Sequence, residues 1–198
     1  MTGPAAPIVN VGYRSTNYWL IGDGDRRLLL DLGWPGSLGA MRAALRRAGV
    51  APQDIAYGLA THYHMDHAGL GEELKQFGMR LLVVDLQLAA IPAMRAHIKP
   101  QDHYVEIADA GNLVIPASGS RALLAQIGLA GEILPTPGHS DDSVSLLLDD
   151  GSVFTGDLTP PAMATEEEAA TVAASWQLLQ QRGARRCYPA HGPVRALA

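Results

Sequence analysis

Short apolar runs separated by turn residues mark the first part of the chain. Residues 8–13, 17–21 and 28–32 are rich in aliphatic and aromatic side chains, so we expect a strand in each of them. The Gly-Asp-Gly-Asp run at 22–25 tolerates positive φ and predicts a hairpin turn between the second and third strands. The chain is therefore expected to open with antiparallel hairpins.

Helical spacing alternates with buried strands in the remainder of the chain. Helices are expected at 38–48 (capped by Ser37), 71–77, 86–97, 121–127 and 166–181. Strands are expected at 55–60, 80–84, 132–134, 144–148, 153–155 and 185–188, and residues 98–118 are expected to be irregular. Hairpins followed by strand–helix units favour sheets packed together with helices outside, a layered α/β arrangement.

The length and composition fit one globular domain over residues 1–198. Hydrophobic residues make up 47% of the 198 positions, which suits a packed core rather than a disordered chain. The net charge of −5, with the arginines scattered as short pairs, disfavours a nucleic-acid partner, because phosphate binding needs clustered cations. We expect a small-molecule partner, and the sequence leaves open a homodimer.

The single cysteine and the N-terminal residues bear on the compartment. Cys187 is alone, which excludes an internal disulfide and fits a reducing environment, where a buried inert thiol is expected. Residues 1–7 lack the positive region and apolar run of a signal peptide. No stretch is long and apolar enough to span a membrane. These features predict a cytoplasmic protein with no membrane partner.

Histidines gather directly after the strand predicted at 55–60. The run Thr-His-Tyr-His-Met-Asp-His occupies positions 61–67, in a chain with only seven histidines. Alternate residues of an extended backbone project to the same side, so His62 and His64 can share one metal ion. A tightening turn could then aim Asp66 and His67 at a second ion. Imidazole and carboxylate ligands together suit zinc, iron or manganese.

Three further residues sit at the ends of other predicted strands. His139 lies in Thr-Pro-Gly-His at 136–139, Asp157 follows the strand at 153–155, and His191 follows the last strand. Each of them alone could be an ordinary loop or turn residue. Together with the histidine-rich run they complete two coordination spheres.

At these residues the sequence resembles the metallo-β-lactamase superfamily, especially its glyoxalase II-like branch. The His-x-His-x-Asp-His signature of that family is matched at 62–67, its Thr-Pro-Gly-His element at 136–139 and its Gly-Asp element at 156–157. The final histidine of the family is matched by His191, and the early 17–18 and 30–33 segments are similar to its opening hairpins. The resemblance runs from about residue 10 to 192.

The resemblance implies a four-layer αββα sandwich with a binuclear metal site at one edge. His62, His64 and His139 would hold the first divalent ion, while Asp66, His67 and His191 would hold the second. Asp157 would bridge the two ions, and Asp31 would support the ligands from behind. Zinc is the expected metal, with iron and manganese as alternatives. Asp66 and Asp157 are the expected catalytic carboxylates.

Such a site implies hydrolysis of an ester, thioester, lactone or amide bond. A hydroxide that bridges two cations is a nucleophile at neutral pH, because the metals lower the pKa of bound water to about 7. The alternative from another class is a single-iron persulfide dioxygenase of similar fold. A β-lactamase fits less well, because those enzymes are exported and use no bridging aspartate.

Two features depart from the glyoxalase II-like pattern. Ser-Asp-Asp-Ser follows His139 at 140–143, where the extra carboxylates are expected to cap a turn. The chain ends soon after His191, without the helical domain that binds glutathione thioesters in glyoxalase II, so that activity is not expected. For the substrate pocket, the candidates near the cluster are Trp34, Tyr63, His97 and Tyr104, with Met94 and His103 beside them. Core packing explains Trp34 and Met94 equally well, and residues such as His97 and His103 are more often plain surface residues.

Overall fold

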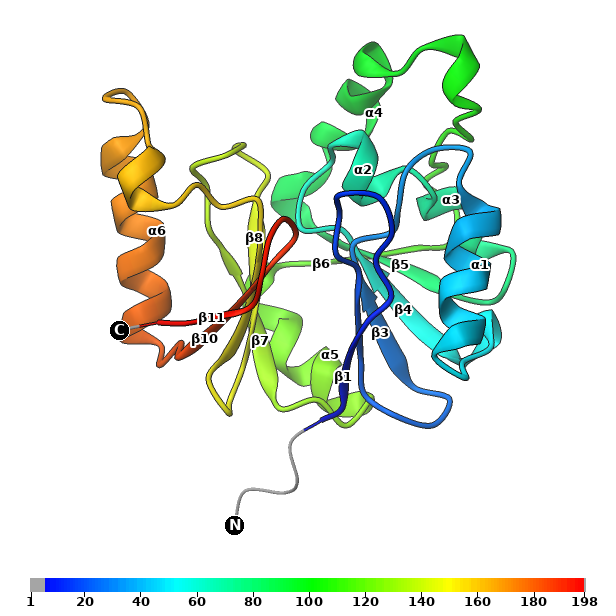
Figure 1. The fold of residues 1–198 in the computed structure, drawn as a ribbon, viewed down its shortest axis with the longest axis horizontal. Coiled ribbons are helices and arrows are strands. Elements are labelled where there is room, and N and C mark those ends of the chain that lie inside the picture. Colours follow the sequence, from blue (N-terminus) through cyan, green and yellow to red (C-terminus); the bar gives the residue numbers. More distant parts are fainter. Residues whose placement is uncertain (1–5, 198) are drawn as a thin grey trace.

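The computed structural model describes residues 6–197, in which two β-sheets stand face to face between layers of helices (Figure 1). The first sheet contains, in spatial order, β1 (Ile8–Asn10), β2 (Trp19–Ile21), β3 (Arg27–Leu30), β4 (Ile55–Leu59), β5 (Arg80–Val84) and β6 (Asn112–Ile115). The second contains β11 (Arg195–Ala196), β10 (Arg186–Pro189), β9 (Ser152–Gly156), β8 (Val144–Leu148) and β7 (Gly131–Pro135).

Pairing in the first sheet changes from antiparallel to parallel at β3. The pairs β1–β2 and β2–β3 are hairpins, as the turn residues predicted, whereas β3 to β6 run parallel. Parallel neighbours need a crossover, and helices supply it. The crossover helices are α1 (Leu38–Arg47), α2 (Met65–Ala68), α3 (Gly71–Lys75) and α4 (Ala90–Met94).

The second sheet is an antiparallel meander extended by a parallel strand. β7, β8 and β9 pair antiparallel, β10 lies parallel to β9, and β11 pairs antiparallel with β10. The long helix α6 (Ala169–Gln181) makes the crossover from β9 to β10, and α5 (Ser120–Gln126) connects the two sheets. Short 3₁₀ helices complete the fold at Pro52–Asp54, Asp85–Gln87, Arg95–His97, Pro100–Asp102, Ala117–Gly119 and Pro161–Met163.

Alternating side chains build three separate hydrophobic cores, one between each two adjacent layers. On β5, Leu82 and Val84 pack between the sheets, while Leu81 and Val83 pack under the helices of the first layer. On β9, Phe154 faces the other sheet and Val153 faces α6. Strands buried on both faces need cover on both sides. The result is the expected four-layer αββα sandwich, with α6 outside one sheet and α1 and α3 outside the other (Figure 1).

The structure corrects three expectations about elements. Residues 98–118 are not all irregular, because Asn112–Ile115 adds β6 to the edge of the first sheet. The helix expected over 86–97 is shorter, and α4 keeps Pro92 within its first turn, where the missing N–H of proline is tolerated. The helix expected over 166–181 begins later, at Ala169.

Parts of two expectations lie outside the described residues. The region that lacks signal-peptide features falls largely on residues 1–5, and residue 198 ends the predicted domain. That residues 1–198 form one domain stays a prediction. Among residues 6–197, no helix combines the length and the apolar character needed to cross a bilayer.

Candidate metal centre

All seven predicted ligands meet at one edge of the sandwich, and they come from both sheets. His62 and His64 follow β4, and Asp66 and His67 lie on α2. His139 follows β7, Asp157 follows β9, and His191 follows β10. Each strand therefore delivers its polar residue just beyond its carboxyl end.

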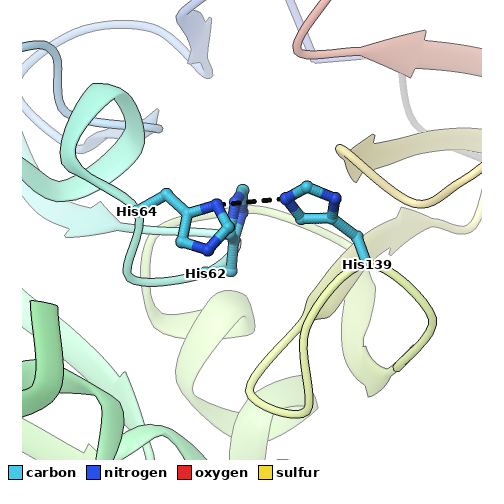
Figure 2. A group of neighbouring side chains, drawn as sticks. All are labelled: His62, His64 and His139. Carbon is cyan, nitrogen blue, oxygen red and sulfur yellow. Dashed lines mark hydrogen bonds between the residues drawn. The ribbon is translucent and has the colours of Figure 1, made fainter. Parts of the chain in front are cut away.

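Three imidazoles form the first group. Figure 2 shows His62, His64 and His139 turned toward a common point, with His139 coming from the loop opposite the other two. The ring centroid of His62 lies 4.4 Å from that of His64 and 4.8 Å from that of His139. Nε2 of His139 lies 3.1 Å from Nδ1 of His64. Three nitrogen donors so arranged match the ligand set of a zinc or iron site.

Asp66, His67 and His191 form the second group. Oδ2 of Asp66 lies 3.3 Å from Nε2 of His67 and 3.3 Å from Nε2 of His191. Donor atoms of this group all lie within 4.8 Å of one another, as they do in the first. A turn of α2 brings Asp66 and His67 to this point, which is the tightening that the sequence suggested.

Asp157 lies between the two groups. Its Oδ2 is 3.3 Å from Nε2 of His67 and 3.7 Å from Nε2 of His139, and its Oδ1 is 3.4 Å from Nε2 of His191. A single carboxylate thus reaches a ligand of the first group and two ligands of the second. This position is the one that a bridging ligand needs.

Asp31 orients two of the imidazoles from behind. Its Oδ2 lies 3.0 Å from Nδ1 of His67. Its Oδ1 accepts hydrogen bonds from the backbone N–H and the hydroxyl of Thr61, and that hydroxyl lies 3.2 Å from Nδ1 of His62. With Nδ1 of each ring so engaged, Nε2 is left to face the site. Asp31 is buried and has a φ of 61°, a left-handed conformation that aims its carboxylate at both partners.

The loop at residues 13–17 supports the second group from the opposite side. The Thr16 hydroxyl donates to Oδ2 of Asp66 over 3.1 Å, and Nδ1 of His191 donates to the carbonyl of Ser15 over 2.7 Å. The second contact leaves Nε2 of His191 free to face Asp66 and Asp157. Sequence reasoning missed both contacts, since neither Ser15 nor Thr16 lies in a recognisable motif.

A buried amide ties the ligand loops together. Gln87 donates from Nε2 to the carbonyls of Ala60 and Asp142, while its Oε1 accepts from the N–H of Val84. The carboxylate of Asp142 in turn accepts the N–H of Tyr63 over 2.7 Å. Asp142 thus ties its loop to the histidine-rich run, whereas the local bonds of the turn at 140–143 are made by Ser140 and Ser143. Gln87 was missed because its sequence surroundings predict only a helix.

The pKa values of the proposed ligands are shifted in different directions. Burial, followed by the neighbouring imidazoles, holds the pKa of His62 well below its ordinary value. Burial also lowers the pKa of His67, but Asp31, Asp157 and Asp66 outweigh it and hold that pKa well above normal. Burial raises the pKa of Asp66, yet His67 and Thr16 contribute to bringing it down to about 2. The three carboxylates around His67 thus favour its protonated form.

A cavity of about 340 Å³ opens beside the ligands. It is lined by His139, His191, the 155–160 segment, Met163, Pro189 and Arg195. The residues expected to line a pocket lie elsewhere: Tyr63 and Met94 are buried in the core under the helices, and Trp34 and Tyr104 pack against that core. His97 and His103 are exposed. A substrate role for Trp34, Tyr63, His97 or Tyr104 stays a prediction.

Known proteins show the same arrangement of sequence and fold. A family model described as the metallo-beta-lactamase superfamily matches residues 11–191. The beta-lactamase-like protein 2 homolog of Caenorhabditis elegans is 27% identical over 186 residues, which are 91% of this chain and 57% of that protein. The atrochrysone carboxyl ACP thioesterase of Aspergillus terreus is 26% identical over 185 residues, 91% of this chain and 50% of that protein. The chain thus spans about half the length of these relatives.

A solved structure shares the fold over nearly its whole length. TTHA1623 in a di-iron-bound form superposes with a TM-score of 0.72 at 21% identity, covering 96% of this chain and 94% of that one. At this identity the likeness concerns the fold alone.

Proposed function

The chain belongs to the metallo-β-lactamase superfamily, and from this premise we infer that it is a hydrolase with a two-metal centre. The bond cleaved is an ester, thioester, lactone or amide of a small molecule. A thioester is the first choice for a test, because one relative is named a thioesterase. A cytoplasmic location and a homodimer stay predictions.

Buried polar atoms without partners carry this proposal. Nε2 of His62 is buried without a hydrogen-bond partner among residues 6–197. Nε2 of His67 and Oδ1 of Asp157 are buried too and make no hydrogen bond of good geometry, although other proposed ligands lie 3.3–3.4 Å away. Leaving such groups unpaired costs about 1–3 kcal/mol each, so the arrangement is stable only if something else satisfies them. A divalent cation accepts lone pairs from imidazole and carboxylate alike. The donor set therefore fits metal ions at the two groups described.

The number of donors favours two ions over one. Five imidazoles and two carboxylates converge, whereas a tetrahedral site takes four ligands. His62, His64 and His139 would hold one ion, and Asp66, His67 and His191 the other, with Asp157 shared. Zinc is the proposed metal, and iron is the alternative because a neighbour of the same fold is described in a di-iron form.

The residues of this chain would have separate roles in hydrolysis. Bound divalent ions polarise a carbonyl and make water acidic enough to react near neutral pH. Asp66, which its pKa of about 2 keeps ionised at neutral pH, would serve as an anionic ligand of the second ion. Asp31 and the Ser15 carbonyl hold the imidazoles in the orientation that binding requires. The cavity beside His139 and His191 gives the acyl group access to the site.

Metal content and hydrolysis together test the proposal. Protein purified without added metal and then loaded with zinc should hold about two ions per chain by elemental analysis. It should hydrolyse at least one member of a panel of thioesters, lactones and aryl esters. His62→Ala should abolish that hydrolysis and retain the fold, whereas Gln180→Ala, an exposed change on α6, should leave it unchanged.

The persulfide dioxygenase alternative predicts a different metal content and a different reaction. It requires one iron per chain, consumption of oxygen with a glutathione persulfide, and no hydrolysis of the panel. A protein that binds at most one ion in excess zinc or manganese, or that consumes oxygen in this way, contradicts the two-metal hydrolase.

A further inference from the structure

We propose that Arg195 forms an anion-binding subsite beside the metal centre, so that the substrate carries a carboxylate or similar anionic group near its scissile carbonyl. The inference rests on the proposed hydrolytic function and deepens it by naming a substrate class.

Arg195 shares a cavity with three of the proposed metal ligands. His139, Asp157 and His191 line the same 340 Å³ space as Arg195. No other lysine or arginine is among the residues that line it, and Asp157 is the only carboxylate among them. Because Asp157 faces the histidines, the remaining wall presents one fixed positive charge. A molecule that fills this cavity can therefore contact both the proposed ligands and Arg195.

A strand pairing and a contact with an aromatic ring constrain the position of the Arg195 guanidinium. Arg195 lies in β11 and pairs with Cys187 of β10. Its guanidinium carbon lies 5.7 Å from the centroid of the Trp176 ring, within the range of a cation–π contact. The Trp176 indole donates a hydrogen bond of 2.8 Å to the carbonyl of Thr159, another residue of the cavity wall. A cation positioned in advance binds an anion at a lower entropic cost.

The charge of Arg195 has no carboxylate partner in the described part of the chain. Some exposed arginines are paired, such as Arg182 with Glu132 over 3.0 Å and Arg121 with Asp149 over 2.9 Å. Among residues 6–197, no carboxylate lies within ion-pair distance of Arg195. Two bound divalent ions would make this cavity more positive still. The planar guanidinium is suited to a carboxylate, which it can bind through two parallel hydrogen bonds.

Two matched thioesters distinguish an effect of Arg195 on a substrate with a carboxylate from an effect on hydrolysis in general. Mono-S-phenyl thioglutarate and S-phenyl thiovalerate share a leaving group and an acyl chain, and only the first has a terminal carboxylate. Both would be assayed with the zinc-loaded wild type, Arg195→Gln, Arg195→Lys and the control Arg186→Gln. Arg186 is an exposed arginine on β10 that does not line the cavity.

Loss of the guanidinium should lower kcat/KM for the thioglutarate ester by about ten- to a hundredfold, the range for a hydrogen bond between charged groups. The neutral ester should change by less than about threefold, a loss too small for a charged hydrogen bond. Arg195→Lys should restore part of the loss, since it keeps the charge, and Arg186→Gln should match the wild type. Equal losses for both esters would mean that Arg195 only packs on Trp176, and would overturn the proposal.

A binding measurement keeps the subsite testable if neither ester is hydrolysed. Glutarate titrated into the zinc-loaded protein and followed by calorimetry should bind at least tenfold more weakly to Arg195→Gln than to the wild type or Arg186→Gln. That result, with no hydrolysis of any member of the thioester, lactone and aryl ester panel, would contradict the proposed function and support the subsite. Equal binding by the wild type and Arg195→Gln would overturn the subsite whatever the protein hydrolyses.

Discussion

At the scale of single residues, the groups behind the ligands decide how the ligands are presented. Thr16 is buried, and its hydroxyl meets Asp66, a residue 50 positions away in the chain. This hydrogen bond fixes one carboxylate oxygen without adding a ligand. Partners of this kind commonly change metal affinity by about 10–100-fold when they are removed.

Thr16→Val should therefore weaken the second metal ion selectively. Valine keeps the shape but removes the donor to Asp66, so metal titration followed by calorimetry should show one site of unchanged affinity and one weaker by about tenfold or more. Thr171→Val, an exposed substitution of the same type on α6, is the control. An unchanged second affinity in Thr16→Val would show that this hydroxyl serves only the fold.

The raised pKa of His67 predicts that a proton is released when metal binds. Its pKa is raised in the metal-free protein, so the ring is protonated at neutral pH, and a metal at Nε2 must displace that proton. His62, whose pKa is lowered by burial, is already neutral and releases none. Affinity should thus fall as the pH falls below neutrality.

Calorimetry in two buffers of different ionisation enthalpy measures this exchange directly. At neutral pH the difference in binding enthalpy should correspond to about one proton per chain. The same enthalpy in both buffers would mean that His67 carries no proton in the metal-free protein.

At the scale of elements, the sharp turn after β9 sets the relation between the two sheets at the site. Gly156 has a φ of 54°, and a Cβ built there would overlap the side chain of Thr61. Thr61 is the residue that links Asp31 to His62. The close approach of β9 to the end of β4 therefore requires glycine, and it places Asp157 beside the ligands of the first sheet.

Gly156→Ala should destabilise the fold by about 3 kcal/mol, the sum of a left-handed backbone penalty and an overpacked contact. Gly78→Ala is the matched control, since Gly78 also has positive φ but has open space where a Cβ would lie. That control should cost about 1–2 kcal/mol. Urea unfolding of the metal-free variants gives both values. Similar losses at the two positions would show that the contact with Thr61 relaxes easily.

At the scale of the whole molecule, metal ions would join the two halves of the sandwich. The first sheet and α2 supply His62, His64, Asp66 and His67, whereas the second sheet supplies His139, Asp157 and His191. A ligand that binds only the folded state stabilises it by about 2.7 kcal/mol at a hundredfold excess over Kd. Metal should therefore oppose separation of the sheets.

Removal of metal with a chelator should lower Tm by about 5–10 °C for a chain of this size. Scanning calorimetry of zinc-loaded and metal-free protein measures the shift. His139→Ala should lose part of it, because that variant removes the ligand that the second sheet gives to the first group, while Asp157 and His191 remain. Identical Tm values with and without zinc would mean that the sheets are not joined through the metal.

Features that depend on near neighbours along the chain could be predicted from the sequence. The spacing of His62, His64, Asp66 and His67 within six residues fixes how they can project from a strand end and a turn, so the ligand run was found without the fold. The hairpin at 22–25 and most strands and helices were found for the same reason, because turn residues and side-chain period act locally. The match to the family motifs extended this to the layered fold.

Tertiary structure alone decided which distant residues meet. Ser15 and His191 are 176 positions apart, and Gln87 reaches carbonyls near residues 60 and 142; no local pattern marks such contacts. The edge strand β6 was missed because its pairing with β5, rather than its own weak pattern, stabilises it. Arg195 likewise resembles any exposed arginine until β11 pairs with β10 and brings it to the cavity. Contacts of this range arise from the packing of two sheets, which burial of the shared apolar core enforces and single-residue propensities do not encode.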